Sequence, residues 1–148
     1  MKPSHKYFMY KALDQAKIAF YNNEVPVGAI IVYNNKIIAK SHNLCEGLID
    51  FTAHAEIQAF TCASNYLKNK YLNECTLYTT LEPCIMCAGA SFWTRIGLIV
   101  FGANDEKRGF TTIKQKVLHP STEIISGILK EECSSILKDF FLNKRKKE

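Results

Sequence analysis

Two short stretches of the chain contain residue types that bind metals and transfer protons. His54 and Glu56 form an H-x-E pattern, and Cys84 and Cys87 follow Pro83 in a P-C-x-x-C pattern. Side chains three positions apart share one face of a helix, so both sulfurs can bind one ion. The start of a helix also favours the negatively charged thiolate that zinc requires. The spacing therefore predicts a zinc site at the start of a helix.

The number of ligands predicts a catalytic site. His54, Cys84 and Cys87 make three protein ligands, and catalytic zinc sites have three protein ligands and one open position for water. Glu56 lies two residues after His54, close enough to exchange a proton with that water. A closed structural zinc site in a noncatalytic RNA-binding module is a different hypothesis, and it requires a fourth protein ligand.

Composition and charge limit the class of protein. The 148 residues are 47% hydrophobic and 22% charged, which predicts one globular domain over residues 1–148. The net charge is +5, of which residues 144–148 contribute +3. This basic C-terminal helix or tail is suited to neutralising phosphates.

The N-terminal region shows no apolar run typical of a secretory signal, and no stretch reaches the roughly 20 apolar residues of a membrane span. We therefore expect a cytoplasmic protein without a membrane segment, whose six cysteines stay reduced.

Hydrophobic periodicity predicts the elements that position these residues. An apolar stripe with Ser4 as its N-cap predicts a first helix that ends near Tyr21. Two β-branched runs, 28–33 and 36–39, flank Asn34 and Asn35 and predict a hairpin. The remaining expected elements are a helix capped by Thr52 and ending near Cys62, a strand 76–80, a helix from near Cys84, a strand 96–101, a loop 102–109, a strand 123–126 and a final helix that continues into the basic tail. This alternation predicts an α/β fold with a central mixed sheet and helices on both faces.

The two metal-site patterns together match H-x-E…P-C-x-x-C, the signature of zinc deaminases. Blocks at 24–29, 52–57, 81–90 and 101–103 extend the match along almost the whole chain. The sequence is thus identified as similar to the bacterial tRNA-specific adenosine deaminases. The resemblance implies a three-layer α/β/α cytidine-deaminase-like fold with a five-stranded sheet. It further implies a homodimer with one Zn²⁺ per subunit that forms inosine at the wobble position of a tRNA anticodon loop.

The resemblance also implies two sets of binding residues. The substrate-binding set is Asn43, Val27, Ala55 and Asp105, and within it Asn43 is expected to contact the flipped base. The RNA-contacting set is Lys107, Arg108, Phe140, Phe141, Lys144 and Arg145. The two phenylalanines have a second interpretation as core residues, because they also fit the apolar stripe of the last helix.

The chain departs from the family pattern in its loops. Phe51 replaces a proline, Phe110 replaces a small residue, and the segment after Pro120 is shorter. The alternative function is deamination of a free base or nucleotide, of the guanine or cytosine type, by the same zinc site.

Overall fold

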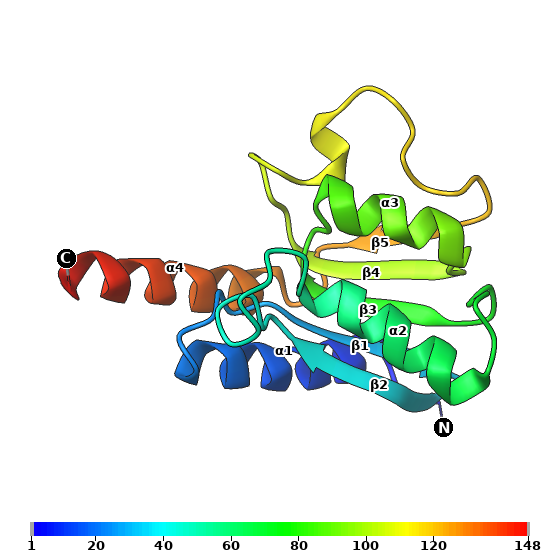
Figure 1. Ribbon diagram of the computed structural model, residues 1–148, viewed down its shortest axis with the longest axis horizontal. Helices are drawn as coiled ribbons and strands as arrows, with labels where there is room; N and C mark the ends of the chain where they lie inside the picture. The colour runs from blue at the N-terminus through cyan, green and yellow to red at the C-terminus, as the bar shows by residue number, and fades with distance from the viewer. Residues whose placement is uncertain (1, 148) are drawn as a thin grey trace.

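The computed structural model describes residues 2–147, so Glu148 of the predicted basic tail lies outside the described residues. Figure 1 shows a sheet packed between helices. The elements, in chain order, are α1 (His5–Tyr21), β1 (Gly28–Tyr33), β2 (Lys36–His42), α2 (Ala55–Leu67), β3 (Thr76–Leu81), α3 (Ile85–Thr94), β4 (Leu98–Ala103), the 3-10 helix η1 (Phe110–Thr112), β5 (Glu123–Ser126) and α4 (Lys130–Lys147).

The five strands form one mixed sheet in the order β2-β1-β3-β4-β5. Strand β1 is antiparallel to both β2 and β3, whereas β3, β4 and β5 are parallel. Asn34 and Asn35 both have positive φ, 50° and 61°, and form the predicted hairpin turn between β1 and β2. A parallel connection needs a crossover, which α3 provides between β3 and β4. The predicted mixed five-stranded sheet is confirmed.

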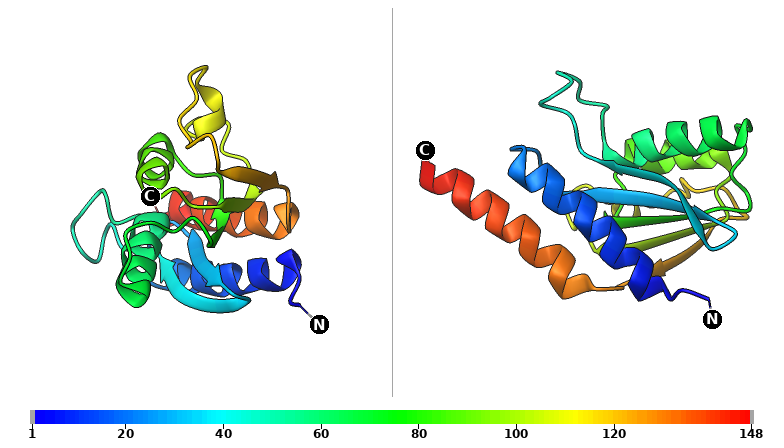
Figure 2. Two further views of the ribbon diagram at one scale, coloured as in Figure 1. Left: turned by 90° about the vertical axis from the view of Figure 1, so that its right-hand side faces the viewer. Right: turned by 90° about the horizontal axis from the view of Figure 1, so that it is seen from below.

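Helices cover both faces of this sheet, as the two views of Figure 2 show. Helices α2 and α3 pack on one face over a core that includes Ile31 and Phe101. Helices α1 and α4 pack on the other face over a core that includes Ile30 and Tyr78. Successive strand residues such as Ile30 and Ile31 point to opposite faces, so β1 contributes to both cores. The three-layer α/β/α architecture is confirmed.

The prediction for the first helix is correct, but that for the second is wrong at both ends. Ser4 caps α1 and its hydroxyl accepts a hydrogen bond from the N–H of Tyr7 at 3.0 Å. The N-cap of α2 is His54, because the Thr52 hydroxyl instead donates to the carboxylate of Asp50 at 2.7 Å. The helix also continues past Cys62, to Leu67.

Two predicted strands have different bounds in the structure. Strand β2 continues beyond Ala39 to His42, because its residues stay paired with β1 as far as Gly28. Strand β4 begins at Leu98 and includes Gly102, which was predicted to lie in a loop. The strand continues past Phe101 because it stays paired with β3, where Leu81 lies opposite Ala103.

The C-terminal end of helix α4 extends beyond the sheet and beyond the end of α1 (Figure 1). None of the helices in residues 2–147 combines the length and the apolar character needed to cross a lipid bilayer.

Candidate active site

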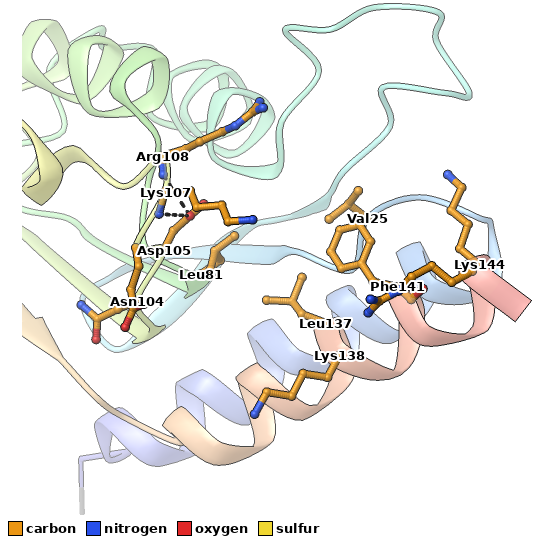
Figure 3. Close-up of a pocket in the computed structure, with 12 residues that line it drawn as sticks. Val25, Leu81, Asn104, Asp105, Lys107, Arg108, Leu137, Lys138, Phe141 and Lys144 are labelled. Atoms are coloured by element: carbon orange, nitrogen blue, oxygen red, sulfur yellow. Dashed lines mark hydrogen bonds between the residues drawn. The ribbon is translucent and has the colours of Figure 1, made fainter.

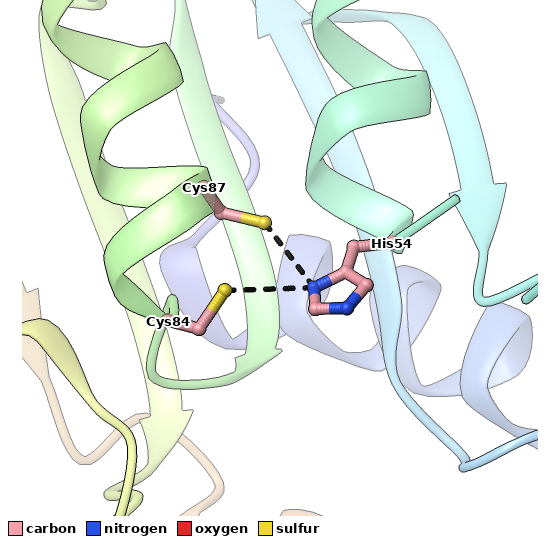
Figure 4. Close-up of side chains that lie close together, drawn as sticks. All are labelled: His54, Cys84 and Cys87. Carbon is pink, nitrogen blue, oxygen red and sulfur yellow. Dashed lines mark hydrogen bonds between the residues drawn. The ribbon is translucent and has the colours of Figure 1, made fainter. Parts of the chain in front are cut away.

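The predicted metal ligands come from the starts of two neighbouring helices on one face of the sheet. His54 is the N-cap of α2 and Cys84 is the N-cap of α3, with Cys87 in the first turn of α3. The Nδ1 atom of His54 lies 3.5 Å from the Sγ atom of Cys84 and 3.5 Å from that of Cys87 (Figure 4). The three ligand atoms all lie within 4.8 Å of one another, so they can bind one ion.

The pKa values of the two cysteines in this group are shifted in opposite directions. Hydrogen bonds with Cys87 and then with His54 lower the pKa of Cys84 to about 4, against the opposing effect of burial. The hydrogen bond to Cys84 and burial raise the pKa of Cys87 above its usual range. Two cysteine sulfurs and an imidazole form a donor set of the kind that zinc prefers.

Within residues 2–147, the only group of three or more potential metal ligands is His54, Cys84 and Cys87. No fourth histidine, cysteine or carboxylate of the described chain joins it. A closed structural site needs four protein ligands, so this arrangement is not the one that the structural-zinc hypothesis requires. Three ligands leave one coordination position for water or substrate.

Glu56 lies in the first turn of α2, two residues after His54, and is only 4% exposed. Burial raises the pKa of its carboxyl group to about 7, although a hydrogen bond from its own backbone N–H and the charge of His54 act in the opposite direction. A group that titrates near neutral pH can both accept and donate a proton. The carboxyl group of Glu56 is therefore suited to general acid and base chemistry beside the metal ligands.

Three residues of the predicted substrate-binding set form one hydrogen-bonded group next to His54. The Asn43 side-chain oxygen accepts a hydrogen bond from the N–H of Ala55 at 3.0 Å, and the Asn43 N–H donates to the carbonyl of Val27 at 3.2 Å. All three residues are buried. This group connects the end of β2 to the first residue of α2, and it fixes the position of the Asn43 amide relative to His54.

Asp105, the fourth residue of that set, lies elsewhere, in the loop after β4. Its carboxylate accepts hydrogen bonds from the backbone N–H groups of Lys107 at 3.2 Å and Arg108 at 3.0 Å, so it stabilises the turn of its own loop. The structure thus places Asp105 with the predicted RNA-contacting residues and not with Asn43.

A groove of about 1010 Å³ lies between this loop and the C-terminal half of α4 (Figure 3). It contains five cationic and two acidic side chains together with four apolar ones. Its lining residues are Val25, Leu81, Asn104, Asp105, Glu106, Lys107, Arg108, Leu137, Lys138, Phe141, Lys144 and Arg145. Five of the six predicted RNA-contacting residues therefore line one groove, although they come from segments about thirty residues apart.

Phe140 is the exception and requires a correction. It is 5% exposed and packs edge-on against Phe20, with ring centroids 5.8 Å apart. Phe141 is 44% exposed and lines the groove. Consecutive helical residues point about 100° apart, so one phenylalanine faces the core and the next faces the groove. Phe140 is a core residue and presents no ring to a nucleic acid.

None of the three candidate metal ligands lines the groove. The loop that forms one wall of the groove is nevertheless tied to the metal site. Gly109 pairs with Cys84 in an isolated antiparallel bridge, and the N–H of Phe110 donates to the carbonyl of Pro83 at 3.0 Å. Phe110 itself packs edge-on against Phe101, so this departure from the family pattern adds a core contact.

The sequence analysis missed two buried carboxylates that hold loops near the site. Glu24 accepts hydrogen bonds from the N–H groups of Glu46 at 2.9 Å and Gly47 at 2.7 Å. Glu82 accepts hydrogen bonds from the loop after β4. Both lie within the apolar blocks 24–29 and 81–90, and a charged residue inside an apolar block is the signal that predicts a buried, hydrogen-bonded role.

Comparisons with known proteins agree with this geometry. The MafB19-like deaminase family matches residues 3–145. A tRNA-specific adenosine deaminase of Rickettsia typhi (strain ATCC VR-144 / Wilmington) is 43% identical over 144 residues, 93% of this chain and 97% of the relative. A structure from studies of A-to-I editing by tRNA:A34 deaminases at the wobble position of transfer RNA matches with a TM-score of 0.83 and 38% identity, covering 88% of this chain and 98% of that one. A guanine deaminase of Bacillus subtilis matches with a TM-score of 0.66 and 36% identity, covering 69% of this chain and 66% of the other.

Proposed function

The chain belongs to the tRNA-specific adenosine deaminases within the MafB19-like deaminase family, and from this premise we propose that it converts adenosine to inosine at the wobble position of a tRNA anticodon loop. The observation that carries the chemistry is the group of His54, Cys84 and Cys87 beside the buried Glu56. The tRNA-specific adenosine deaminase of Rickettsia typhi is 43% identical over 93% of this chain, whereas the guanine deaminase of Bacillus subtilis is 36% identical over only 69% of it, so the free-base alternative is not favoured.

Zinc is the proposed cofactor, with one ion per subunit held by His54, Cys84 and Cys87. A zinc ion at such a site supplies Lewis-acid activation of water at neutral pH. The protein must supply the proton transfers, the position of the base and the exclusion of bulk water.

Glu56 is the proposed general base and general acid. Its carboxylate takes a proton from the water that attacks C6 of adenine and delivers that proton to ring N1. It then transfers the second proton of the water to the amino group, which leaves C6 as ammonia while the C6–O bond becomes a carbonyl. Burial raises the pKa of the Glu56 carboxyl group to about 7, so the group can both accept and donate a proton near neutral pH.

Asn43 is the proposed contact to the flipped base, with Val27 and Ala55 shaping the same pocket. Their hydrogen bonds to one another hold the Asn43 amide in place before substrate binds. An adenosine in the anticodon loop must leave the base stack before its C6 atom can enter the active site. A preformed contact lowers the entropy lost when the flipped base is captured.

The groove between the loop after β4 and helix α4 is the proposed RNA-binding surface. Lys107, Arg108, Lys144 and Arg145 are exposed and suited to phosphates, and the exposed ring of Phe141 is suited to stacking on an unpaired base. Asp105 belongs to this proposal as the residue that shapes the turn of the loop.

A homodimer in the cytoplasm completes the proposal. The side chains of Ile49, Phe51 and Trp93 are large, apolar and exposed, as expected of surfaces that a second subunit covers. Trp93 is the only tryptophan of the chain, so its fluorescence reports burial directly. A blue shift of its emission as the protein concentration rises, together with a dimeric mass by light scattering, is the expected result.

The test of the proposed function is inosine formation in a tRNA anticodon stem-loop with a wobble adenosine, assayed beside free adenine, guanine, cytosine and their nucleosides. Inosine in the RNA and no turnover of the small molecules is expected. Turnover of a free base or nucleoside alone would retain the site chemistry and replace the proposed substrate by the alternative.

A further inference from the structure

Glu82 lies directly after β3 and two residues before Cys84, and its side chain is 2% exposed. One carboxylate oxygen accepts a hydrogen bond from the N–H of Asp105 at 3.1 Å and a longer one from the Asn104 amide at 3.4 Å. The other oxygen accepts hydrogen bonds from the N–H and the hydroxyl of Thr111, at 2.9 and 2.7 Å. One oxygen of Glu82 therefore holds the start of segment 104–111, and the other oxygen holds its end.

This segment includes the wall of the groove that contains Lys107 and Arg108. Within this segment, the Asp105 carboxylate closes a turn by accepting hydrogen bonds from the backbone N–H groups of Lys107 and Arg108. The Cys84–Gly109 bridge attaches the same segment to Cys84, one of the three candidate metal ligands. The Glu82 side chain thus holds the loop that carries Lys107 and Arg108 close to the start of α3.

Gly109 shows how closely the segment approaches this carboxylate. A Cβ atom at Gly109 would overlap the Oε2 atom of Glu82. The backbone of Gly109 has φ −65° and ψ 151°, a conformation that every residue adopts, so conformational freedom does not explain the glycine. The Glu82 carboxylate and the carbonyl oxygen of Asp105 both lie where that Cβ atom would be, so Gly109→Ala would press on the carboxylate and on the loop itself.

We propose that Glu82 is a positioning residue for RNA binding, which holds segment 104–111 so that Lys107 and Arg108 face the groove at a fixed place relative to the metal site. This inference rests on the proposed function, because the groove must bind RNA for the position of these cations to matter. The role differs from a purely structural one in that its loss weakens RNA binding and leaves the chemistry at saturating RNA intact.

The main experiment measures binding of a fluorescent anticodon stem-loop to Glu82→Gln at several salt concentrations. A glutamine has one acceptor oxygen in place of two, so its amide nitrogen faces donors at one end of the segment. We expect Kd to rise about tenfold and the slope of log K against log salt to become less steep by about 1 to 2, because two cations are displaced. In deamination assays KM rises in proportion, whereas kcat and zinc content stay at their unaltered values.

The matched control is Glu24→Gln. Glu24 is also 2% exposed and also accepts backbone N–H groups from a loop, but the residues that it holds, Glu46 and Gly47, do not line the groove. Its effect on thermal stability is expected to resemble that of Glu82→Gln, with no change of the salt slope. Loss of stability alone therefore cannot produce the expected result.

A double-mutant cycle separates positioning from a general effect. If Glu82 acts through the loop cations, Glu82→Gln adds little to a variant in which Lys107 and Arg108 are already alanine. Full additivity, an unchanged Kd for Glu82→Gln, or loss of zinc with unchanged RNA binding would overturn the inference. If Glu82→Gln does not fold, Gly109→Ala decides by the same measurements. Failure of the unaltered protein to bind the stem-loop would refute the proposed function itself.

Discussion

The metal group and the groove solve two different problems with different kinds of side chains. His54, Cys84 and Cys87 lie at the starts of two helices, and their ligand atoms lie within 4.8 Å of one another. The groove contains long cationic side chains, from a loop and from the part of α4 that extends past the sheet. The proposed chemistry is thus placed at the starts of packed helices, whereas the proposed RNA recognition uses long, exposed side chains.

This difference predicts which kinetic quantity each region controls. Changes in the metal group remove an interaction needed at the reacting atoms, so they lower kcat. Changes in the groove remove contacts to phosphates and bases far from C6, so they change RNA affinity and its salt dependence.

The largest effect is expected for Cys87→Ala. Removal of one of three ligands should abolish stoichiometric metal binding and reduce inosine formation to background, and the melting temperature should fall because metal binding energy is partly folding energy. Metal analysis by mass spectrometry measures the first effect directly. The control is Cys75→Ala, since Cys75 is equally buried but lies outside the metal group. Full metal content in Cys87→Ala would exclude this cysteine from the ligand set.

Glu56→Gln should separate proton transfer from metal binding. The amide keeps the size of the side chain and removes its ability to accept a proton, so we expect unchanged metal content and a fall in kcat of about 10² to 10⁴-fold. RNA affinity should stay within about twofold, because Glu56 does not line the groove. Near-normal turnover would contradict the proposed role.

The difference between the metal group and the groove also explains which parts of the molecule could be predicted from the sequence. The metal ligands and Glu56 form short patterns in the chain, and a pattern of residue types is visible without any fold. The first helix and the hairpin were equally local, since Ser4 and the Asn34-Asn35 pair determine a cap and a turn from a few residues. Local interactions within a few positions are what a sequence pattern records.

The errors and omissions arise either from a competing hydrogen bond nearby in the chain or from contacts between distant segments, and residue types specify neither. Thr52 is a good N-cap by residue type, but its hydroxyl binds Asp50 and the helix begins three residues later. Glu82 accepts hydrogen bonds from residues more than twenty positions away, and Phe140 is buried by Phe20 across more than one hundred. The pairing of Asp105 with its own loop likewise depends on a turn that residue types alone do not specify.

The two adjacent phenylalanines test the division between core and groove directly. Phe140→Ala should lower the free energy of unfolding by about 3 kcal/mol, because it removes a buried ring, and leave RNA affinity within about twofold. Phe141→Ala should weaken RNA binding by about 1 to 3 kcal/mol through the lost stacking and change stability by less than about 0.5 kcal/mol. Urea titration and anisotropy of a labelled stem-loop measure the two quantities. An exchange of the two effects would contradict the assignment of these faces.

The smallest effect is expected for Lys144→Gln, which removes one charge from the α4 wall of the groove. One phosphate contact fewer makes the slope of log K against log salt less steep by about 1, with a modest loss of affinity. Lys36→Gln, an exposed lysine in β2 that does not line the groove, is the matched control and should leave the slope unchanged. An unaltered slope for Lys144→Gln beside a reduced slope for Arg108→Ala would mean that the RNA backbone follows the loop wall alone. Helix α4 would then contribute only the ring of Phe141 to RNA binding. The cations that bind RNA would all lie in the loop that pairs with Cys84 through Gly109.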